Sequence, residues 1–187
     1  MFVRAAMMKD ARGIAVVHVR SWQAAYAGLM PQDVLDDLSI DDRAERWAQI
    51  LGEPDQGSRT LVAERDGEIV GWAGFGAARE RDAPGSGELW GIYALPSAWS
   101  SGVGHALLDA VERELSADGH ATAYLWVLDG NERAAAFYTR HGWIDDDGTK
   151  VEERPGLVLN ERRHVKVLQR DPARGSDTGR STPTPER

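Results

Sequence analysis

The chain has 187 residues, 42% of them apolar, which predicts one domain with a substantial core rather than a fibrous or membrane protein. No apolar run approaches the roughly 20 residues that span a bilayer, and no signal-peptide core is found near the N-terminus, so we expect a cytoplasmic protein without membrane attachment. A formal net charge of -8 argues against a nucleic-acid partner, and the absence of cysteine excludes disulfides, cysteine-rich metal sites and a cysteine nucleophile.

The first part of the chain has the apolar spacing of helices. Residues 9–27 place apolar and aromatic side chains at intervals of three and four along one face. The pattern then breaks, and two shorter helices are expected at 31–38 and 41–51. Ser39 or Asp41 can cap the second of these helices.

From residue 59 the pattern changes to that of strands. Residues 59–78 predict two strands around the turn Asp66-Gly67, which is a good hairpin signal. The clearest helical stripe runs over 102–117. The other expected elements are strands at 88–95 and 121–128, a helix from Asn131 to about Arg140, and strands near 141–145 and 162–168.

This order of elements predicts an α/β fold. We expect a single domain over residues 1–170, with a mixed twisted sheet flanked by helices and one central strand–helix–strand unit. Residues 171–187 lack core-forming side chains and are predicted to be a disordered tail.

The loop before the clearest helix has the composition of an anion site. Its sequence, WSSGVG over residues 99–104, places two serines and two glycines where a helix begins. A helix N-terminus presents free backbone N–H groups and partial positive charge, and glycine lets a phosphate approach closely. A glycine-containing connection without a ligand would have the same sequence. A dinucleotide fold is disfavoured, because Leu107 stands where its third glycine is expected.

Two motifs together indicate a family. Residues 88–111, ELWGIYALPSAWSSGVGHALLDAV, resemble the strand, pyrophosphate loop and helix of the GNAT superfamily of acetyl-CoA-dependent N-acetyltransferases, whose loop pattern is Arg/Gln-x-x-Gly-x-Gly/Ala. Residues 125–143, LWVLDGNERAAAFYTRHGW, resemble its Asn-x-x-Ala-x-x-Phe-Tyr-x-x-x-Gly-Phe block. The matching residues are Asn131, Ala134, Phe137, Tyr138 and Gly142, with Trp143 for the last Phe. The resemblance covers about residues 3–168.

The resemblance implies how acetyl-CoA would bind. Backbone groups of Ile92, Tyr93 and Ala94 are expected to pair with the pantetheine arm and polarise the thioester, and Asn131 is expected to contact the cofactor. The pyrophosphate is expected at the loop residues Ser100, Ser101, Gly102, Val103, Gly104 and His105. Trp99 occupies the position that is usually Arg or Gln, so its side chain cannot contact phosphate as Arg would, and we expect it to pack or to stack near the cofactor. No metal site is predicted.

The resemblance also assigns the catalytic chemistry. Tyr138 is expected to protonate the leaving thiolate as general acid; without the motif it would be read as a core tyrosine. Glu88 is the candidate base, because its place resembles that of the catalytic glutamate in histone-acetylating members, although a solvated glutamate at a strand end has the same sequence signal. His18, His141 or water are the alternatives for the base. Without cysteine, direct attack by the amine in a ternary complex is the simplest route.

The acceptor is predicted to be a small cationic amine. Aspartates gather in the segment expected near the acceptor, and Trp22 and Tyr26 can supply aromatic surface to a cation; the aspartates are Asp33, Asp36, Asp37, Asp41 and Asp42. A solvated helix face and two core aromatics would give the same pattern. The other functions considered are a protein N-terminal or lysine acetyltransferase and a non-catalytic acyl-CoA-binding module. The resemblance is compatible with a homodimer.

Overall fold

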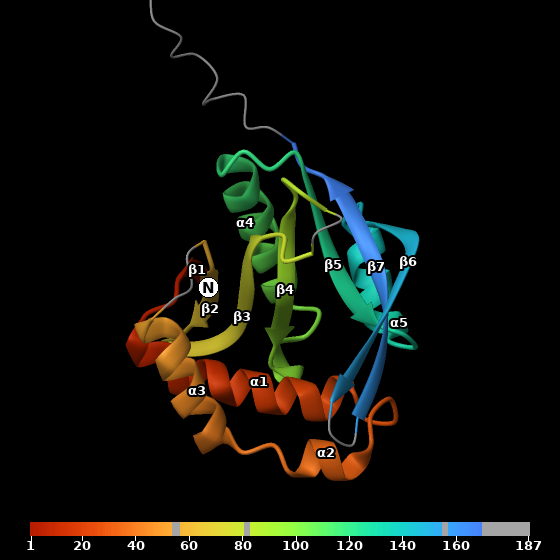
Figure 1. Ribbon diagram of the computed structural model, residues 1–187. Coiled ribbons are helices and arrows are strands. Elements are labelled where there is room, and N and C mark those ends of the chain that lie inside the picture. The colour runs from red at the N-terminus through yellow and green to blue at the C-terminus, as the bar shows by residue number, and fades with distance from the viewer. Residues whose placement is uncertain (54–56, 81–82, 155–156, 170–187) are drawn as a thin grey trace, which may run out of the picture.

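A seven-stranded mixed sheet with helices on both faces makes up the described chain (Figure 1). The computed structural model describes residues 1–53, 57–80, 83–154 and 157–169. The predicted tail at 171–187 lies outside the described residues. The strand order is β1-β2-β3-β4-β5-β7-β6, and the strands are β1 (Phe2–Ala5), β2 (Arg59–Arg65), β3 (Glu68–Ala77), β4 (Gly87–Ala94), β5 (Thr122–Leu128), β6 (Ile144–Arg154) and β7 (Leu157–Val167).

The helices agree with the apolar patterns of the sequence. Short 3₁₀ helices at Met8–Asp10 and Pro96–Ala98 precede two of the longer ones. Ser39 caps α3 by accepting a hydrogen bond from the Asp42 amide, and the Asn131 side chain caps α5 by accepting one from the Ala134 amide. The longer helices are α1 (Ala11–Ala25), α2 (Gln32–Asp36), α3 (Ile40–Gly52), α4 (Val103–Ala117) and α5 (Glu132–Arg140).

The hairpin and the central unit form as predicted. Asp66 and Gly67 both have positive φ, at 53° and 83°, which is the geometry of a two-residue turn that matches strand twist. β4 and β5 pair in parallel, and α4 connects them. Every other pair of neighbouring strands is antiparallel among the described residues.

The observed strands differ from the expected ones in two ways. β1 was not predicted, because four residues are too few to show a period. β6 and β7 have 11 residues each, whereas only about five and seven were expected. Their charged residues hid the pattern, since each strand exposes much of its length, and residues 151–154 of β6 and 157–160 of β7 pair only with each other.

Apolar packing on the two faces of the sheet fixes its helices. On one face α4 and α5 cover a core that includes Leu107, Val111 and Phe75. On the other face α1 and α3 pack through Ile14 and Trp47 against the strands. Buried apolar area is the main stabilising term for such layers.

Candidate active site

The central strands separate after a short paired stretch. β4 and β5 pair only at Gly87–Ala123, Glu88–Tyr124 and Leu89–Leu125. β4 continues as far as Ala94, bound to β3 along its other edge, so the edge that faces β5 is left open. Figure 1 shows the two strands diverging below this point. A wedge with free backbone groups on one wall therefore opens in the middle of the sheet.

The wedge holds a cleft of about 530 Å³. Its walls come from α1, the open parts of β4 and β5, the loop before α4, and α5. Nine of the predicted site residues line it: Ile92, Tyr93, Ala94, Ser100, Gly102, Gly104, His105, Asn131 and Tyr138. Three do not: Ser101 turns its hydroxyl to the Ala98 carbonyl (2.7 Å), Val103 is buried in the core, and Glu88 lies where β4 is still paired.

A β-bulge sets the faces of β4. Phe75 pairs with Leu89 and Gly74 with Gly91, so Trp90 is the extra residue. Leu89 and Ile92 consequently pack into the same core although they are three residues apart. Strict alternation along β4 would place Glu88 and Ile92 on one face of the sheet, and the bulge at Trp90 prevents this.

The loop before α4 has the geometry of an anion site. Gly102 is the N-cap with φ 87°, and Ser100 also has positive φ, at 57°. The Ala106 amide donates to the Gly102 carbonyl at 3.0 Å and makes the first regular hydrogen bond of the helix. The amides that precede Ala106 therefore have no acceptor within the helix. Arg65 adds positive charge nearby, since its Nη2 donates to Ser101 Oγ at 2.9 Å.

The two glycines of this loop have different physical reasons. Gly102 has a backbone conformation that side chains disfavour. A Cβ on Gly104 would lie 3.3 Å from ring atoms Cε2 and Cζ of Phe137, so glycine there lets α5 pack closely on α4. A substitution at Gly104 would therefore test helix packing as well as ligand binding.

Trp99 is held in place from two sides. Its indole Nε1 donates to the Ala94 carbonyl at 2.9 Å, and the guanidinium carbon of Arg133 lies 3.2 Å from the centre of its ring. Trp99 and Arg133 both line the cleft. The sequence reasoning did not single out Arg133, although it lies inside the motif that begins at Asn131.

Tyr138 is a buried residue of the cleft lining. It is 7% exposed, and its hydroxyl forms no hydrogen bond with any residue that the structure describes. Burial, with a contribution from Tyr93, raises the pKa of Tyr138, so its hydroxyl is protonated throughout the neutral range. The hydroxyls of Tyr26 and Tyr93 lie 3.0 Å apart and also face this space.

Glu88 is enclosed by polar partners. It is 2% exposed, its Oε1 accepts from Arg79 Nη2 at 2.6 Å, and its Oε2 accepts from Arg79 Nε and from the Tyr124 hydroxyl, both at 3.0 Å. Burial raises the pKa of the Glu88 carboxyl, but the hydrogen bonds from Arg79 outweigh burial and the net pKa is lowered. This geometry favours a structural role, and the base function of Glu88 stays a prediction.

The two alternative histidines lie outside the cleft lining. His18 is buried among aromatic rings, and burial with the nearby Arg43 charge lowers the pKa of His18 to about 3. His141 is hydrogen-bonded at Nδ1 to the Phe137 carbonyl (2.8 Å) and at Nε2 to His105 Nδ1 (2.9 Å). His18 is therefore neutral at pH 7, and both ring nitrogens of His141 are engaged.

Glu161 on β7 is a carboxylate that the sequence reasoning missed. It lines the cleft and is paired with Leu128 at the end of β5. Its Oε2 is buried 3.2 Å from Lys150 Nζ without hydrogen-bond geometry. The five aspartates expected near the acceptor are exposed on α2, α3 and the turn between them, and none lines the cleft.

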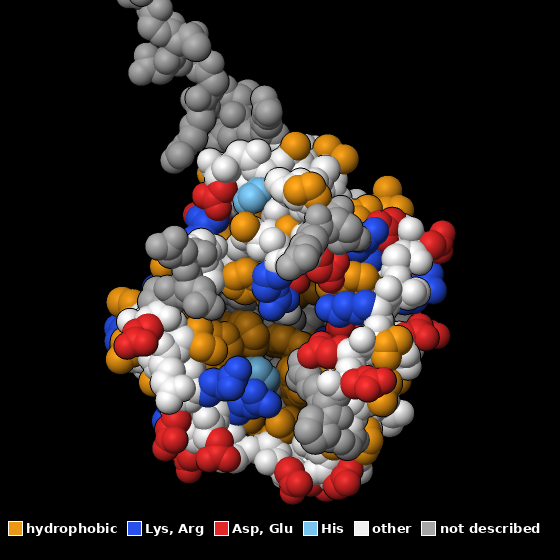
Figure 2. All heavy atoms as spheres, viewed as in Figure 1, with side chains coloured by type: hydrophobic (Ala, Val, Ile, Leu, Met, Phe, Trp, Pro, Cys, Tyr) orange, Lys and Arg blue, Asp and Glu red, His pale blue; other side chains and the backbone are white. Residues whose placement is uncertain are grey.

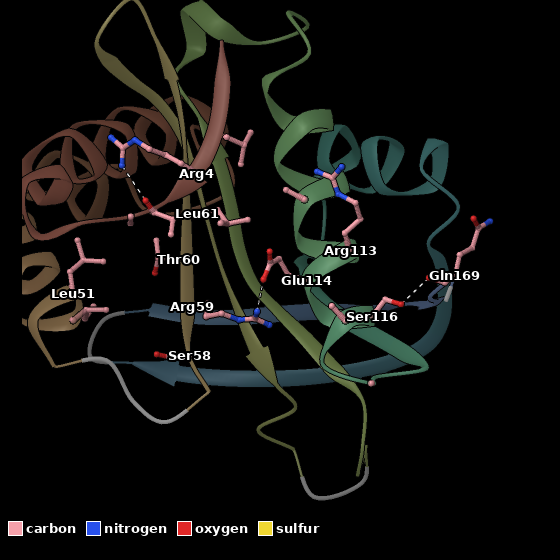
Figure 3. Close-up of a pocket in the computed structure, with 17 residues that line it drawn as sticks. Arg4, Leu51, Ser58, Arg59, Thr60, Leu61, Arg113, Glu114, Ser116 and Gln169 are labelled. Carbon is pink, nitrogen blue, oxygen red and sulfur yellow. Dashed lines mark hydrogen bonds and ion pairs between the residues drawn. The ribbon is translucent and has the colours of Figure 1, made fainter. Parts of the chain in front are cut away.

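A second, larger hollow of about 850 Å³ lies between β1, β2, α3 and α4 (Figure 3). Two of its arginines pair with carboxylates of the protein. Arg59 bonds Glu114 at 2.5 Å and also Asp118, and Arg4 binds Asp10 at 2.5 Å and Glu64 at 2.6 Å. Figure 3 shows Arg59 directed at Glu114 across the hollow. The hollow contains none of the predicted site residues.

The face viewed in Figure 2 has a hollow lined by hydrophobic side chains, with acidic and basic groups around its rim. Over the described ranges, no cluster of three or more His, Asp or Glu side chains could hold a metal ion. None of the helices in the described part of the chain is long and apolar enough to cross a membrane.

Comparison with known proteins gives one consistent family. Residues 20–143 match the model of the acetyltransferase (GNAT) family. An uncharacterized N-acetyltransferase of Bacillus subtilis, YuaI, is 31% identical over 134 residues, which are 69% of this chain and 72% of that protein. A mycothiol acetyltransferase of Frankia alni is 38% identical over 112 residues, which are 56% of this chain and only 31% of that protein.

Solved structures with lower identity share the fold. A ribosomal-protein-alanine N-acetyltransferase from Brucella melitensis has a TM-score of 0.67 at 22% identity, covering 90% of this chain and 100% of that one. An N-acetyltransferase from Thermoplasma acidophilum, PaiA, solved with coenzyme A, has a TM-score of 0.64 at 19% identity, covering 89% and 98%.

Proposed function

The chain belongs to the GNAT acetyltransferase family and is an N-acetyltransferase that acts with acetyl-CoA, and we propose that it transfers the acetyl group directly to a small cationic primary amine held in the β4–β5 wedge. The observation that carries this proposal is the open edge of β4, which leads to the loop at the start of α4. One wall can bind an extended chain and its end can bind an anion. The proposed cofactor residues are those that line this path.

The proposed reaction is a single displacement. The amine nitrogen bonds to the thioester carbonyl carbon, the carbon–sulfur bond breaks, and the thiolate takes the Tyr138 proton. The position of Tyr138 in the cleft supports this role, as does its hydroxyl, which has no hydrogen-bond partner among the described residues. The attacking amine loses its proton to water or to a base at the acceptor side, and solvent restores the proton of Tyr138.

The acceptor side supports a cationic amine through Glu161 and aromatic surface. Glu161, Tyr26 and Trp90 line the cleft, and a carboxylate beside aromatic rings is a suitable setting for an ammonium group. The exposed aspartates would contribute only to the long-range field. The relatives named mycothiol acetyltransferase match over about a third of their own length, so the acceptor proposed here rests on the cleft rather than on their name.

A charge placed at the phosphate loop tests the cofactor position. His105→Glu puts a carboxylate in the first turn of α4, where the helix dipole tolerates it, so the fold should persist. Repulsion of the diphosphate should weaken CoA binding at least roughly tenfold by calorimetry. Arg113→Glu, which places a carboxylate two turns further along the same helix, is the matched control. Equal affinity of His105→Glu and wild type would place the diphosphate elsewhere.

Salt and acceptor charge test the amine. In a screen that detects CoA release, cationic amines should be the best acceptors, and their kcat/KM should fall as salt shortens the Debye length to about 8 Å at physiological ionic strength. Glu161→Gln should raise the acceptor KM and leave the KM of acetyl-CoA unchanged. If uncharged or anionic acceptors are preferred, the electrostatic part of the proposal fails while acetyl transfer stands.

A further inference from the structure

Arg133 is a cation that lines the cleft and has no anionic partner among the described residues. No salt bridge or hydrogen bond links its side chain to any other residue in the described ranges. Two arginines elsewhere in the molecule do have carboxylate partners: Arg79 pairs with Glu88 and Arg59 with Glu114. Partial burial lowers the pKa of Arg133 and no anion raises it. A guanidinium that is partly desolvated and unpaired is available for an anion that comes from outside the protein.

The Trp99 ring fixes the direction in which Arg133 can act. The guanidinium lies over the ring at 3.2 Å, and the ring is held by its bond to the Ala94 carbonyl. Stacking occupies the flat face of the guanidinium and leaves its N–H groups free at the edge. Because the stack restricts the side chain in advance, less conformational entropy is lost when these groups bind a ligand.

The position of the stacked pair points to a phosphate group. Trp99 immediately precedes the loop whose Ser100, Gly102 and Gly104 line the cleft, and Arg133 lines the same cleft from the first turn of α5. Arg65 also contacts this loop, because it donates a hydrogen bond to Ser101 Oγ. The anion that the loop amides would hold thus has a bidentate donor beside it.

We propose that Arg133, stacked on Trp99, binds the diphosphate of acetyl-CoA and supplies the side-chain cation that Trp99 itself cannot supply. The assignment rests on the proposed cofactor position in the β4–β5 wedge. Trp99 is then a positioning residue, which acts through Arg133 rather than on the cofactor directly.

Calorimetry with three probes tests the assignment. Arg133→Ala should weaken binding of CoA and of 3′-dephospho-CoA alike, by roughly 10- to 100-fold, because hydrogen bonds to charged groups are strong. Pantetheine, which has no diphosphate, should bind the variant and wild type equally. Arg133→Lys should give an intermediate loss, since it keeps the charge without the planar fork. Arg113→Ala removes an exposed arginine of α4 and should bind CoA as wild type does.

The role of Trp99 is tested by a double-mutant cycle. Trp99→Ala should weaken CoA binding in wild type and have little further effect in Arg133→Ala, because the two changes remove one interaction. Trp99→Phe keeps a ring for stacking and should retain more affinity than Trp99→Ala. Thermal unfolding of each variant shows that the fold is intact.

Several results would overturn the proposal. These are an unchanged CoA affinity in Arg133→Ala, a loss confined to CoA with 3′-dephospho-CoA unaffected, an equal loss for pantetheine, and strict additivity in the cycle. The second of these would assign Arg133 to the 3′-phosphate. The proposed function fails separately, if wild type does not bind CoA or if His105→Glu binds it normally.

Discussion

The two hollows of this protein differ in how their polar groups are partnered. In the larger one, between β2 and α4, Arg4 and Arg59 each bind two carboxylates of the protein. In the smaller cleft, Tyr138 and Arg133 have no polar partner among the described residues. Size alone would select the larger hollow, at about 850 Å³ against 530 Å³. Unpaired polar groups are the better guide, because buried polar groups are normally satisfied and exceptions need a reason.

The largest effect is expected where the unpaired hydroxyl lies. Tyr138→Phe keeps the ring and removes the proton donor, so turnover should fall by roughly 10²–10⁴ while CoA affinity changes little. Single-turnover kinetics with an accepted amine would separate the chemical step from product release.

Tyr124→Phe is the matched control, because it removes a buried tyrosine hydroxyl that bonds Glu88 outside the cleft. Normal turnover in Tyr138→Phe, with chemistry rate-limiting, would return Tyr138 to a packing role and would remove the contrast between the two hollows.

A substitution of Glu88 tests whether this carboxylate is a structural ion-pair partner or the catalytic base. Glu88→Gln leaves Arg79 and Tyr124 without their acceptor charge, and the free energy of unfolding should fall by about 1–3 kcal/mol. If Glu88 is the base, turnover should fall most at low pH, where the amine is most fully protonated. A pH–rate profile parallel to wild type would leave Glu88 with its structural role.

Acid unfolding gives a second reading of Glu88. Its pKa is lowered in the folded state, so its contribution to stability is present above the ordinary pKa near 4.5 and is lost as pH falls through the lowered value. Chemical denaturation from pH 7 to pH 3 should therefore show a smaller acid loss in Glu88→Gln than in wild type. Identical slopes would mean that the ion pair with Arg79 contributes nothing.

The smallest effect is expected in the larger hollow. Arg59→Met keeps an apolar stem over Phe75 and removes the partly exposed pairs with Glu114 and Asp118, so stability should change by under about 1 kcal/mol. CoA affinity and turnover should match those of wild type. A clear loss of either would show that the larger hollow takes part in function.

The sequence predicts the elements whose pattern is local. The stripe of α4, the Asp66-Gly67 hairpin and the Asn131 cap each depend on residues a few positions apart, and all three are confirmed. The bulge at Trp90 and the length of β6 and β7 depend on partner strands far along the chain, so no local pattern reveals them.

In the candidate site, too, residues within local motifs could be predicted, and residues placed by distant partners could not. Tyr138, Asn131 and the loop at 100–105 lie in motifs, so a resemblance finds them. Glu161 reaches the cleft only through the register of β7 against β5, and the stacking of Arg133 on Trp99 joins residues 34 positions apart in the sequence. Glu88 shows the reverse case, because its motif position predicts a base and its surroundings are those of an ion pair. The homodimer and the cytoplasmic location stay predictions.

The short paired stretch between β4 and β5 divides the sheet into two parts. β1 to β4 form one part and β5 to β7 the other, and only three residue pairs of β4 and β5 join them within the sheet. An extended molecule lying in the wedge would bridge β4 and β5 as an added strand does. The packing of α4 and α5 would hold the two parts of the sheet together when the wedge is empty. Separation of β4 from β5 would then depend on whether a ligand occupies the wedge. Backbone amides along Trp90–Ala94 and Trp126–Leu128 should therefore exchange their hydrogens more slowly when CoA is present. Release of the product would remove this bridge between β4 and β5, so the turnover rate would depend on how readily the two parts of the sheet separate.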